Sequence, residues 1–219
     1  MRALFFIATA VVLTATPSFA QGSRGYIEGA GGFVVSPDDT SGNVVGEVAV
    51  RIAPRLMVYG NLGKFGNIQP SELEPAVDAT STLVATADGL QVTGIARVPA
   101  WYSLGGLRYE VLSRKRILPY VFGGAGFAHL TPKVEFDYSS GTLTGLTPAV
   151  GDNVTPQLIS MGEFTQPSTS NAFEFSLGGG AEMPVAKHWA VDAGYHFSRI
   201  EADTPLNAQG ATFGLGYRF

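Results

Sequence analysis

The chain has 219 residues, of which 45% are hydrophobic and only 15% are charged, with 28 glycines, no cysteine and a formal net charge of -4. The length suits one or two domains, and so few charges are unusual for a water-soluble surface, which carries roughly a quarter or more. The acidic balance argues against a nucleic-acid partner, because phosphate binding needs clustered Lys and Arg. The absence of cysteine excludes disulfides.

The first 20 residues have the pattern of a secretory signal peptide. Arg2 precedes the apolar run "ALFFIATAVVLTA", and "SFA" (Ser18, Phe19, Ala20) forms a small-x-small cleavage site. An uncleaved helical anchor is the alternative, but the apolar run is about a dozen residues, shorter than the roughly 20 needed to span a bilayer. We therefore expect an exported protein with a signal peptide over residues 1–20 and a mature chain from Gln21.

Apolar and polar residues then alternate with a period of two along eight segments, separated by clusters of Pro, Gly, Asp, Asn and Ser. This period predicts half-buried β-strands rather than helices. The segments are 25–35, 44–52, 56–65, 101–112, 117–130, 172–185, 189–200 and 210–219.

The connections between these segments are alternately short and long. Such asymmetry is typical of transmembrane barrels, which have tight periplasmic turns and longer outward-facing loops. An even number of strands places both termini on the side of the short turns. We therefore predict an all-β fold, an eight-stranded antiparallel up-and-down transmembrane β-barrel over residues 21–219.

Large apolar side chains share one face of the segments, and small or ionic side chains share the other. In the segment 172–185, for example, Phe173 and Leu177 alternate with Glu174 and Ser176. A soluble barrel or sandwich also alternates, with its apolar face inward. We favour the membrane interpretation because an eight-stranded barrel leaves room inside for small or paired charged residues, whereas large rings suit lipid and its interfaces.

The polar face supplies the candidate site. Charges inside so narrow a barrel must pair or neutralise, so we predict a salt-bridge network that plugs the lumen. The alternative is a small channel or hydrophobic-solute conduit, since charged linings can also set selectivity. The network comprises Glu28, Glu47, Arg51, Arg108, Glu110, Glu174, Glu182, Asp192, His196 and Arg218.

These segments, with "LGGLRYEVL", "ILPYVFGGAGFAHL", "FEFSLGGGAEM", "WAVDAGYHFSRI" and the terminal aromatic residue, resemble the small outer-membrane β-barrel superfamily of OmpA- and OmpX-like proteins. The resemblance implies a cell-surface, porin-family barrel in the outer membrane, in contact with outer-membrane lipid and lipopolysaccharide. We expect a monomer with a structural or surface-interaction role and no cofactor. The resemblance also implies an assembly signal read by the barrel-assembly machinery, formed by Phe213, Leu215, Tyr217 and Phe219.

One short pattern suggests catalysis. "HFS" resembles the H-x-S of outer-membrane lipid A deacylases, in which His is the base for a Ser nucleophile. The Ser-Asn continuation associated with that family is missing here, and the strand phase directs His196 and Ser198 into the lumen. We therefore expect no enzyme activity, with a lipid A-modifying enzyme as the second alternative. His129 and His188 lack metal-ligand spacing.

The two long connections are expected outside the membrane. In the first, 66–100, a helical turn from Pro70 is possible, and Asp88-Gly89 predicts a hairpin with arms 83–87 and 90–94. These arms are too short to cross a membrane, which takes about 9 to 11 residues per strand. The second, 131–171, is rich in Thr, Ser, Gly and Pro and is the expected binding surface.

Overall fold

The computed structural model describes residues 23–36, 39–68, 71, 73–111, 117–142 and 147–219. The predicted signal peptide, 1–20, lies outside these residues, as does the basic turn 113–116. Neither helix of the described chain is long and apolar enough to cross a membrane.

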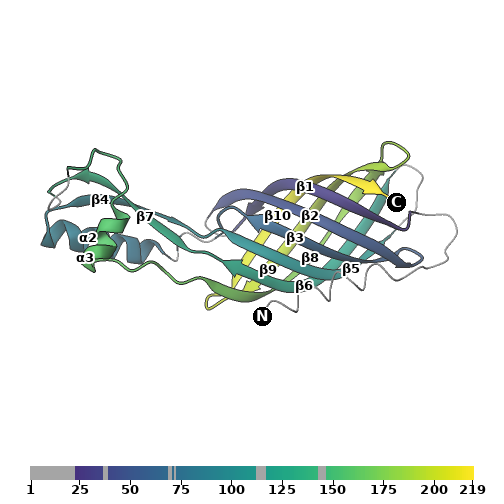
Figure 1. Cartoon of the computed structure of the whole chain (residues 1–219). Helices are drawn as coiled ribbons and strands as arrows, with labels where there is room; N and C mark the ends of the chain where they lie inside the picture. Colours follow the sequence, from purple (N-terminus) through teal and green to yellow (C-terminus); the bar gives the residue numbers. More distant parts are fainter. Residues whose placement is uncertain (1–22, 37–38, 69–70, 72, 112–116, 143–146) are drawn as a thin grey trace.

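Eight strands form a closed antiparallel barrel (Figure 1), so the predicted fold is confirmed. Around the barrel the order is β1-β10-β9-β8-β6-β5-β3-β2, and the last strand pairs with the first, with Tyr26 opposite Arg218. Every predicted strand is present, and β2 and β10 are each extended by four residues at their N-terminal ends. The strands are β1 (Gly25–Val35), β2 (Thr40–Ala53), β3 (Leu56–Phe65), β5 (Ala100–Glu110), β6 (Leu118–Leu130), β8 (Ser170–Pro184), β9 (Trp189–Glu201) and β10 (Leu206–Arg218).

The outer face of the barrel is apolar along the length of the strands. Leu62, Leu107 and Leu177 are each 50–57% exposed there, and aromatic rings gather near the strand ends. Trp189 and Tyr217 meet edge to face at 5.4 Å near the end that carries the C-terminus. Aromatic girdles of this kind are typical of barrels that cross a membrane, with lipid covering the exposed apolar surface.

Not all large rings face outward, contrary to our expectation. Tyr59, Tyr102 and Tyr120 point into the barrel and are buried. Inward-facing glycines make room for them: a Cβ atom on Gly63 would collide with the Tyr102 ring, and one on Gly180 would lie 2.5 Å from the Tyr120 hydroxyl. Glycine in these strands therefore allows large polar rings to fill a narrow interior.

The two long connections fold together into a small unit beyond one end of the barrel (Figure 1), which we call the distal unit. It contains α2 (Glu74–Ala87) and β4 (Gln91–Arg97) from the first connection, and β7 (Lys133–Ser140) and α3 (Thr155–Met161) from the second. β4 and β7 pair as an antiparallel two-stranded sheet. The unit has its own apolar core: Val77, Val84, Leu90, Val134, Phe136, Val154, Leu158 and Phe164.

The predicted hairpin at Asp88-Gly89 is wrong. Residues 83–87 belong to α2, and β4 pairs with β7 of the other connection instead of turning back on itself. Asp88 caps the helix, and Gly89 follows in the left-handed conformation with a φ of 66°. Asp-Gly is thus a helix stop here, because Val77 and Val84 bury one face of α2. The helix begins at Glu74, and the helical turn expected from Pro70 lies outside the described residues.

The candidate functional site in the barrel lumen

One end of the barrel carries the first described residues, Ser23 and Arg24, beside the last residue, Phe219, and we call it the end with the termini. An ion pair crosses the lumen at this end. Arg51 of β2 contacts Glu110 of β5 at 2.7 Å, and a second N–H of the same guanidinium donates to the other carboxylate oxygen at 3.2 Å. The Arg51 Nε–H also donates to the Ser23 carbonyl oxygen. Two parallel hydrogen bonds fix the orientation of both side chains.

Deeper in the lumen, Arg108 is the centre of a buried cluster. Its guanidinium contacts Glu182 at 2.9 Å, Asp192 at 3.6 Å and Glu47 at 3.8 Å. These carboxylates come from β8, β9 and β2, so one cation joins strands from opposite sides of the barrel. An isolated charge would be very costly here, whereas a charge surrounded by carboxylates and hydrogen bonds is retained.

Two tyrosines complete this cluster. The Arg108 guanidinium lies 3.5 Å from the centre of the Tyr120 ring and 4.7 Å from that of Tyr26, as a cation over aromatic faces. Its Nη1–H donates to the Tyr26 hydroxyl oxygen at 2.6 Å, while the Tyr26 hydroxyl donates to Glu47. The Tyr120 hydroxyl donates to Asp192 at 2.7 Å. Glu47 and Asp192 are therefore each held in position by a second partner.

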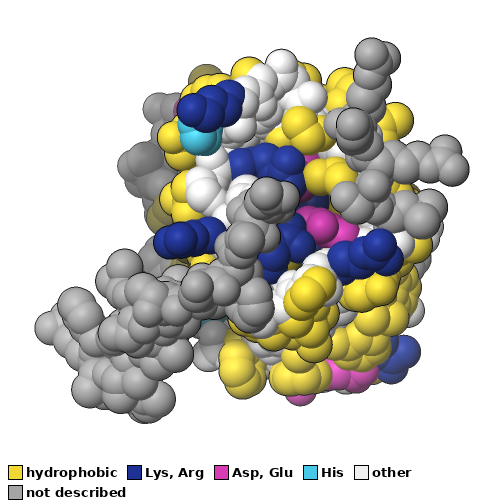
Figure 2. Space-filling view, turned by 90° about the vertical axis from the view of Figure 1, so that its right-hand side faces the viewer, with side chains coloured by type: hydrophobic (Ala, Val, Ile, Leu, Met, Phe, Trp, Pro, Cys, Tyr) yellow, Lys and Arg dark blue, Asp and Glu magenta, His cyan; other side chains and the backbone are white. Residues whose placement is uncertain are grey.

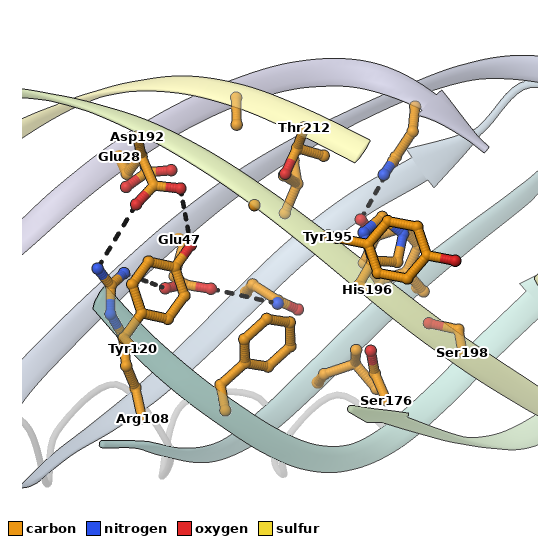
Figure 3. A pocket seen from close by; sticks show the side chains of 18 residues that line it. Glu28, Glu47, Arg108, Tyr120, Ser176, Asp192, Tyr195, His196, Ser198 and Thr212 are labelled. Carbon is orange, nitrogen blue, oxygen red and sulfur yellow. Dashed lines mark hydrogen bonds and ion pairs between the residues drawn. The ribbon is translucent and has the colours of Figure 1, made fainter. Parts of the chain in front are cut away.

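A cavity of about 60 Å³ lies in the middle of the lumen. Figure 3 shows Glu28 beside Asp192 at one end of it, and His196 and Ser198 at the other. Asn43 and Tyr102 line it as well, and the Tyr102 hydroxyl donates to the Asn43 side chain at 3.1 Å. The cavity has room for a few water molecules and is lined by polar groups that bind water.

Beyond the cavity, toward the distal unit, the lumen is filled by apolar side chains. Phe65 and Tyr102 stack there with ring centres 4.4 Å apart. This apolar cluster takes residues from all eight strands around the barrel or from the segments just beyond their ends: Val34, Phe65, Ile68, Val98, Ala100, Tyr102, Leu104, Ala128, Leu130, Ala172, Ile200, Leu206 and Ala208, with Val45 packed against it. All but Val45 are buried.

The structure places all ten predicted network residues on the inner side of the barrel, but it does not bring them into one network. Arg218 contacts Glu182 at 3.0 Å and so joins the Arg108 cluster. Within the described residues Glu28 and Glu174 form no ion pair. Glu174 is fully buried in the half of β8 nearer the distal unit, where it lies opposite Ile200 of the apolar cluster. The predicted ionic interior therefore occupies mainly the half near the termini.

Four residues of the lumen were not predicted from the sequence: Tyr26, Asn43, Tyr102 and Tyr120. Their sequence signal is strand phase, because Tyr26 lies two residues before Glu28, and Tyr102 has the same phase as Arg108. Assigning aromatic rings to lipid by size alone obscured that signal. Phase predicts the face of a strand residue more directly than side-chain size does.

His196 and Ser198 both point into the lumen, as their phase predicts. Ser198 is 1% exposed and His196 is 9% exposed. The centre of the His196 ring lies 6.5 Å from that of Phe65, where the apolar cluster meets the cavity. The described residues contain no group of three or more His, Asp or Glu arranged to hold a metal ion.

The end of the barrel that carries the termini is basic. Figure 2 views the barrel from this end: Lys and Arg side chains surround the lumen, with acidic groups among them. Exposed Arg55 and Lys187 lie in the turns after β2 and β8. By contrast, the described part of the distal unit carries seven acids and two bases: Glu74, Asp78, Asp88, Glu135, Asp137, Asp152 and Glu163, with Arg97 and Lys133.

The four residues of the expected assembly signal lie along the outer face at the end of the chain. Phe213, Leu215, Tyr217 and Phe219 are each at least 42% exposed. Phe219 also closes the barrel through its backbone: its N–H donates to the Gly25 carbonyl oxygen at 3.0 Å, and its own carbonyl oxygen accepts from the Gly25 N–H at 3.2 Å. Phe219 is thus both paired through its backbone and exposed on the outer face of the barrel.

Comparison with protein families finds a match to the model described as "Outer membrane protein beta-barrel domain" over residues 6–219. No curated protein sequence matches the chain significantly. Among solved structures, the chain is similar to Neisserial surface protein A, with a TM-score of 0.55, 13% identity, and 91% of this chain and 100% of that one covered.

Two further structures have lower similarity. The N-terminal β-barrel domain of Pseudomonas aeruginosa OprF aligns with a TM-score of 0.49 at 12% identity, covering 91% of this chain and 100% of that one. The attachment invasion locus protein Ail of Yersinia pestis aligns with a TM-score of 0.48 at 12% identity, covering 91% of this chain and 99% of that one.

Proposed function

Because this chain belongs to the outer membrane protein β-barrel domain family, we propose that it is a closed, non-enzymatic barrel that presents its distal unit at the cell surface for interaction with other molecules. In this proposal the signal peptide exports the chain, the barrel-assembly machinery inserts it, and it works as a monomer among outer-membrane lipid and lipopolysaccharide. The barrel anchors the protein, and the distal unit is its interaction surface.

The observation that carries this proposal is the distal unit itself. Two connections that are far apart in the sequence pair through β4 and β7 and bury Phe136 and Leu158 in a common core. Ordering so many residues costs conformational entropy, which the contacts of the distal unit must offset. Connections that served only to join strands would not need such contacts. A folded unit beyond the barrel end opposite the termini suits a role in surface contact.

The contents of the lumen support a barrel that does not conduct. The Arg108 cluster fills the half near the termini, and the apolar cluster around Phe65 fills the other half. In planar bilayers we expect no steady unitary currents from the purified protein, whereas a variant with both Phe65→Ala and Tyr102→Ala should conduct intermittently. Steady currents from the unmodified protein would favour the small channel instead.

Surface display is testable by cysteine labelling, because the chain has no cysteine of its own. Val150 is 80% exposed in the distal unit, and Lys187 lies in an exposed turn at the opposite end of the barrel. On intact cells a membrane-impermeant maleimide should label Val150→Cys and leave Lys187→Cys unlabelled until the outer membrane is permeabilised. The reverse pattern would contradict the proposed orientation.

The assembly role of the terminal residues needs a test that separates recognition from stability. Deletion of Phe219 should strongly reduce the heat-modifiable, folded form in cells and have a smaller effect on refolding of the purified chain in detergent. Equal losses in both settings would indicate that Phe219 only closes the barrel.

A lipid A-modifying enzyme is the competing proposal. Its Ser198 nucleophile and His196 base would lie inside the barrel, separated from lipid by the barrel wall. We expect the mass spectrum of lipid A to be identical in cells that carry the unmodified chain and cells that carry Ser198→Ala. A difference of one acyl chain between them would establish the enzyme.

A further inference from the structure

The lipid-facing surface of the barrel is not uniformly convex. A groove of about 660 Å³ runs over β8, β9 and β10 and reaches β1. Its floor is formed by small residues, Gly29, Ala181 and Ala193, and its sides by larger ones that include Met183 and Phe213. The groove is open on its outer side, so a long, thin apolar group could lie along it.

The groove lies in the half of the barrel near the termini. Met183 pairs with Val191, and the hairpin connecting the two strands ends in the turn Ala186, Lys187, His188. Because strands rise about 3.3 Å per residue, the turn lies roughly 10 Å beyond that pair. With the short turns in the periplasm, this half of the barrel crosses the inner leaflet of the outer membrane.

At the turn, Lys187 is exposed and has no ion pair or side-chain hydrogen bond within the described residues. Its neighbour His188 is held in place: its ring stacks on Tyr217 with centres 5.5 Å apart, and its Nδ1 lies 3.0 Å from the Arg218 carbonyl oxygen. Trp189 and Tyr217 place two interfacial aromatic rings beside it. A free ammonium group thus lies at headgroup depth below an apolar groove.

We propose that this surface binds one anionic glycerophospholipid of the periplasmic leaflet, with an acyl chain in the groove over Ala181 and Ala193 and the phosphate on Lys187. The groove accepts hydrocarbon because its outward-facing side chains are apolar, and Lys187 supplies the complementary charge. This inference rests on the orientation of the barrel, but it does not depend on the role of the distal unit.

The two tryptophans of the chain make this proposal measurable. Trp189 lies two residues from groove residue Val191, whereas Trp101 is the second residue of β5, at the other end of the barrel. In a Trp101→Phe variant in nanodiscs, Trp189 fluorescence is quenched by lipids with dibrominated acyl chains that lie close to it. We expect brominated phosphatidylglycerol to bind near Trp189 roughly fivefold more strongly than brominated phosphatidylcholine, the ratio expected for one lysine at an anionic surface.

Matched variants separate a site from a general charge effect. Lys187→Gln should bring the ratio close to one, whereas Arg55→Gln, in a turn on the opposite side of the barrel, should leave it unchanged. Ala193→Leu should fill the groove and reduce quenching by both lipids. Ala125→Leu, at an exposed outward alanine of β6 outside the groove, should not.

The reciprocal variant Trp189→Phe, which reports from Trp101, should show no preference between the two lipids. Equal quenching of Trp189 by both lipids would overturn the proposal, as would an equal effect of Arg55→Gln and Lys187→Gln. Heat-modifiable migration verifies that each variant is folded. The cysteine-labelling experiment tests the orientation separately, so the failure of one proposal can be told from the failure of the other.

Discussion

The barrel and the distal unit differ in which side chains they bury: the barrel has charged groups inside and apolar ones outside, and the distal unit has the reverse. In the barrel, Leu177 faces outward at 57% exposure while Glu182 is buried within, whereas in the distal unit Phe136 and Leu158 are buried and the acids lie outside. The difference follows from the surroundings, because lipid removes the advantage of hiding apolar side chains and makes exposed charges costly. The medium, and not the residue type alone, decides which side chains a fold buries.

The largest loss of stability is expected when the central cation of the barrel is removed. Arg108→Ala deprives Glu47, Glu182 and Asp192 of a common partner. We expect the free energy of unfolding of the barrel to fall by about 5 kcal/mol, the upper end of the cost of breaking a buried ion pair. Urea titration of the heat-modifiable form measures this loss. Glu182→Gln is the control, and an equal effect of both variants would argue against a central role of Arg108.

A second test targets the core of the distal unit. Phe136→Ala removes a fully buried ring that meets Phe164 edge to face at 5.0 Å. We expect a loss of about 3–5 kcal/mol, typical of Phe→Ala in a core, and local unfolding of the distal unit. Limited proteolysis of the folded protein measures it. The barrel should keep its heat-modifiable migration, and joint unfolding of both parts would show that they are not independent.

A third test places the same charge on both kinds of exposed apolar surface. Leu177→Arg, on the lipid face of β8, should cost about 2–4 kcal/mol of barrel stability if the side chain lies near the bilayer midplane. Ile95→Arg, on β4 of the distal unit at 39% exposure, should change stability by less than about 0.5 kcal/mol. Unfolding in lipid vesicles measures the first and proteolysis the second. Similar costs would refute the lipid assignment.

Among the ion pairs of the barrel, a small effect is expected for the exposed pair at its rim. Arg199 contacts Glu201 at 2.6 Å, but both side chains are about two-fifths exposed (39% and 41%). Arg199→Ala should therefore lower barrel stability by only about 0–1 kcal/mol, as for surface ion pairs in general. The same urea titration measures it. A loss comparable to that of Arg108→Ala would mean that burial does not distinguish the two pairs.

Within the candidate site, sequence phase predicted more than side-chain chemistry did. The alternation around Glu174, Asp192 and His196 placed these residues in the lumen, where the structure has them. It did not predict that Arg108 pairs with three acids, or that Glu174 forms no ion pair within the described residues. These contacts depend on which strands lie across the barrel from each other. The apolar cluster around Phe65 was missed for the same reason.

The amino-acid sequence by itself determined the number of strands, their phase and the closing of the barrel, because these depend on local alternation and on turn lengths. Only the tertiary structure decided the distal unit, since β4 and β7 pair although β5 and β6 separate them in the sequence. The residues Asp88 and Gly89 are compatible with either a hairpin or a helix end. The burial of Val77 and Val84 against the other connection selects the helix, and that contact lies far away in the sequence.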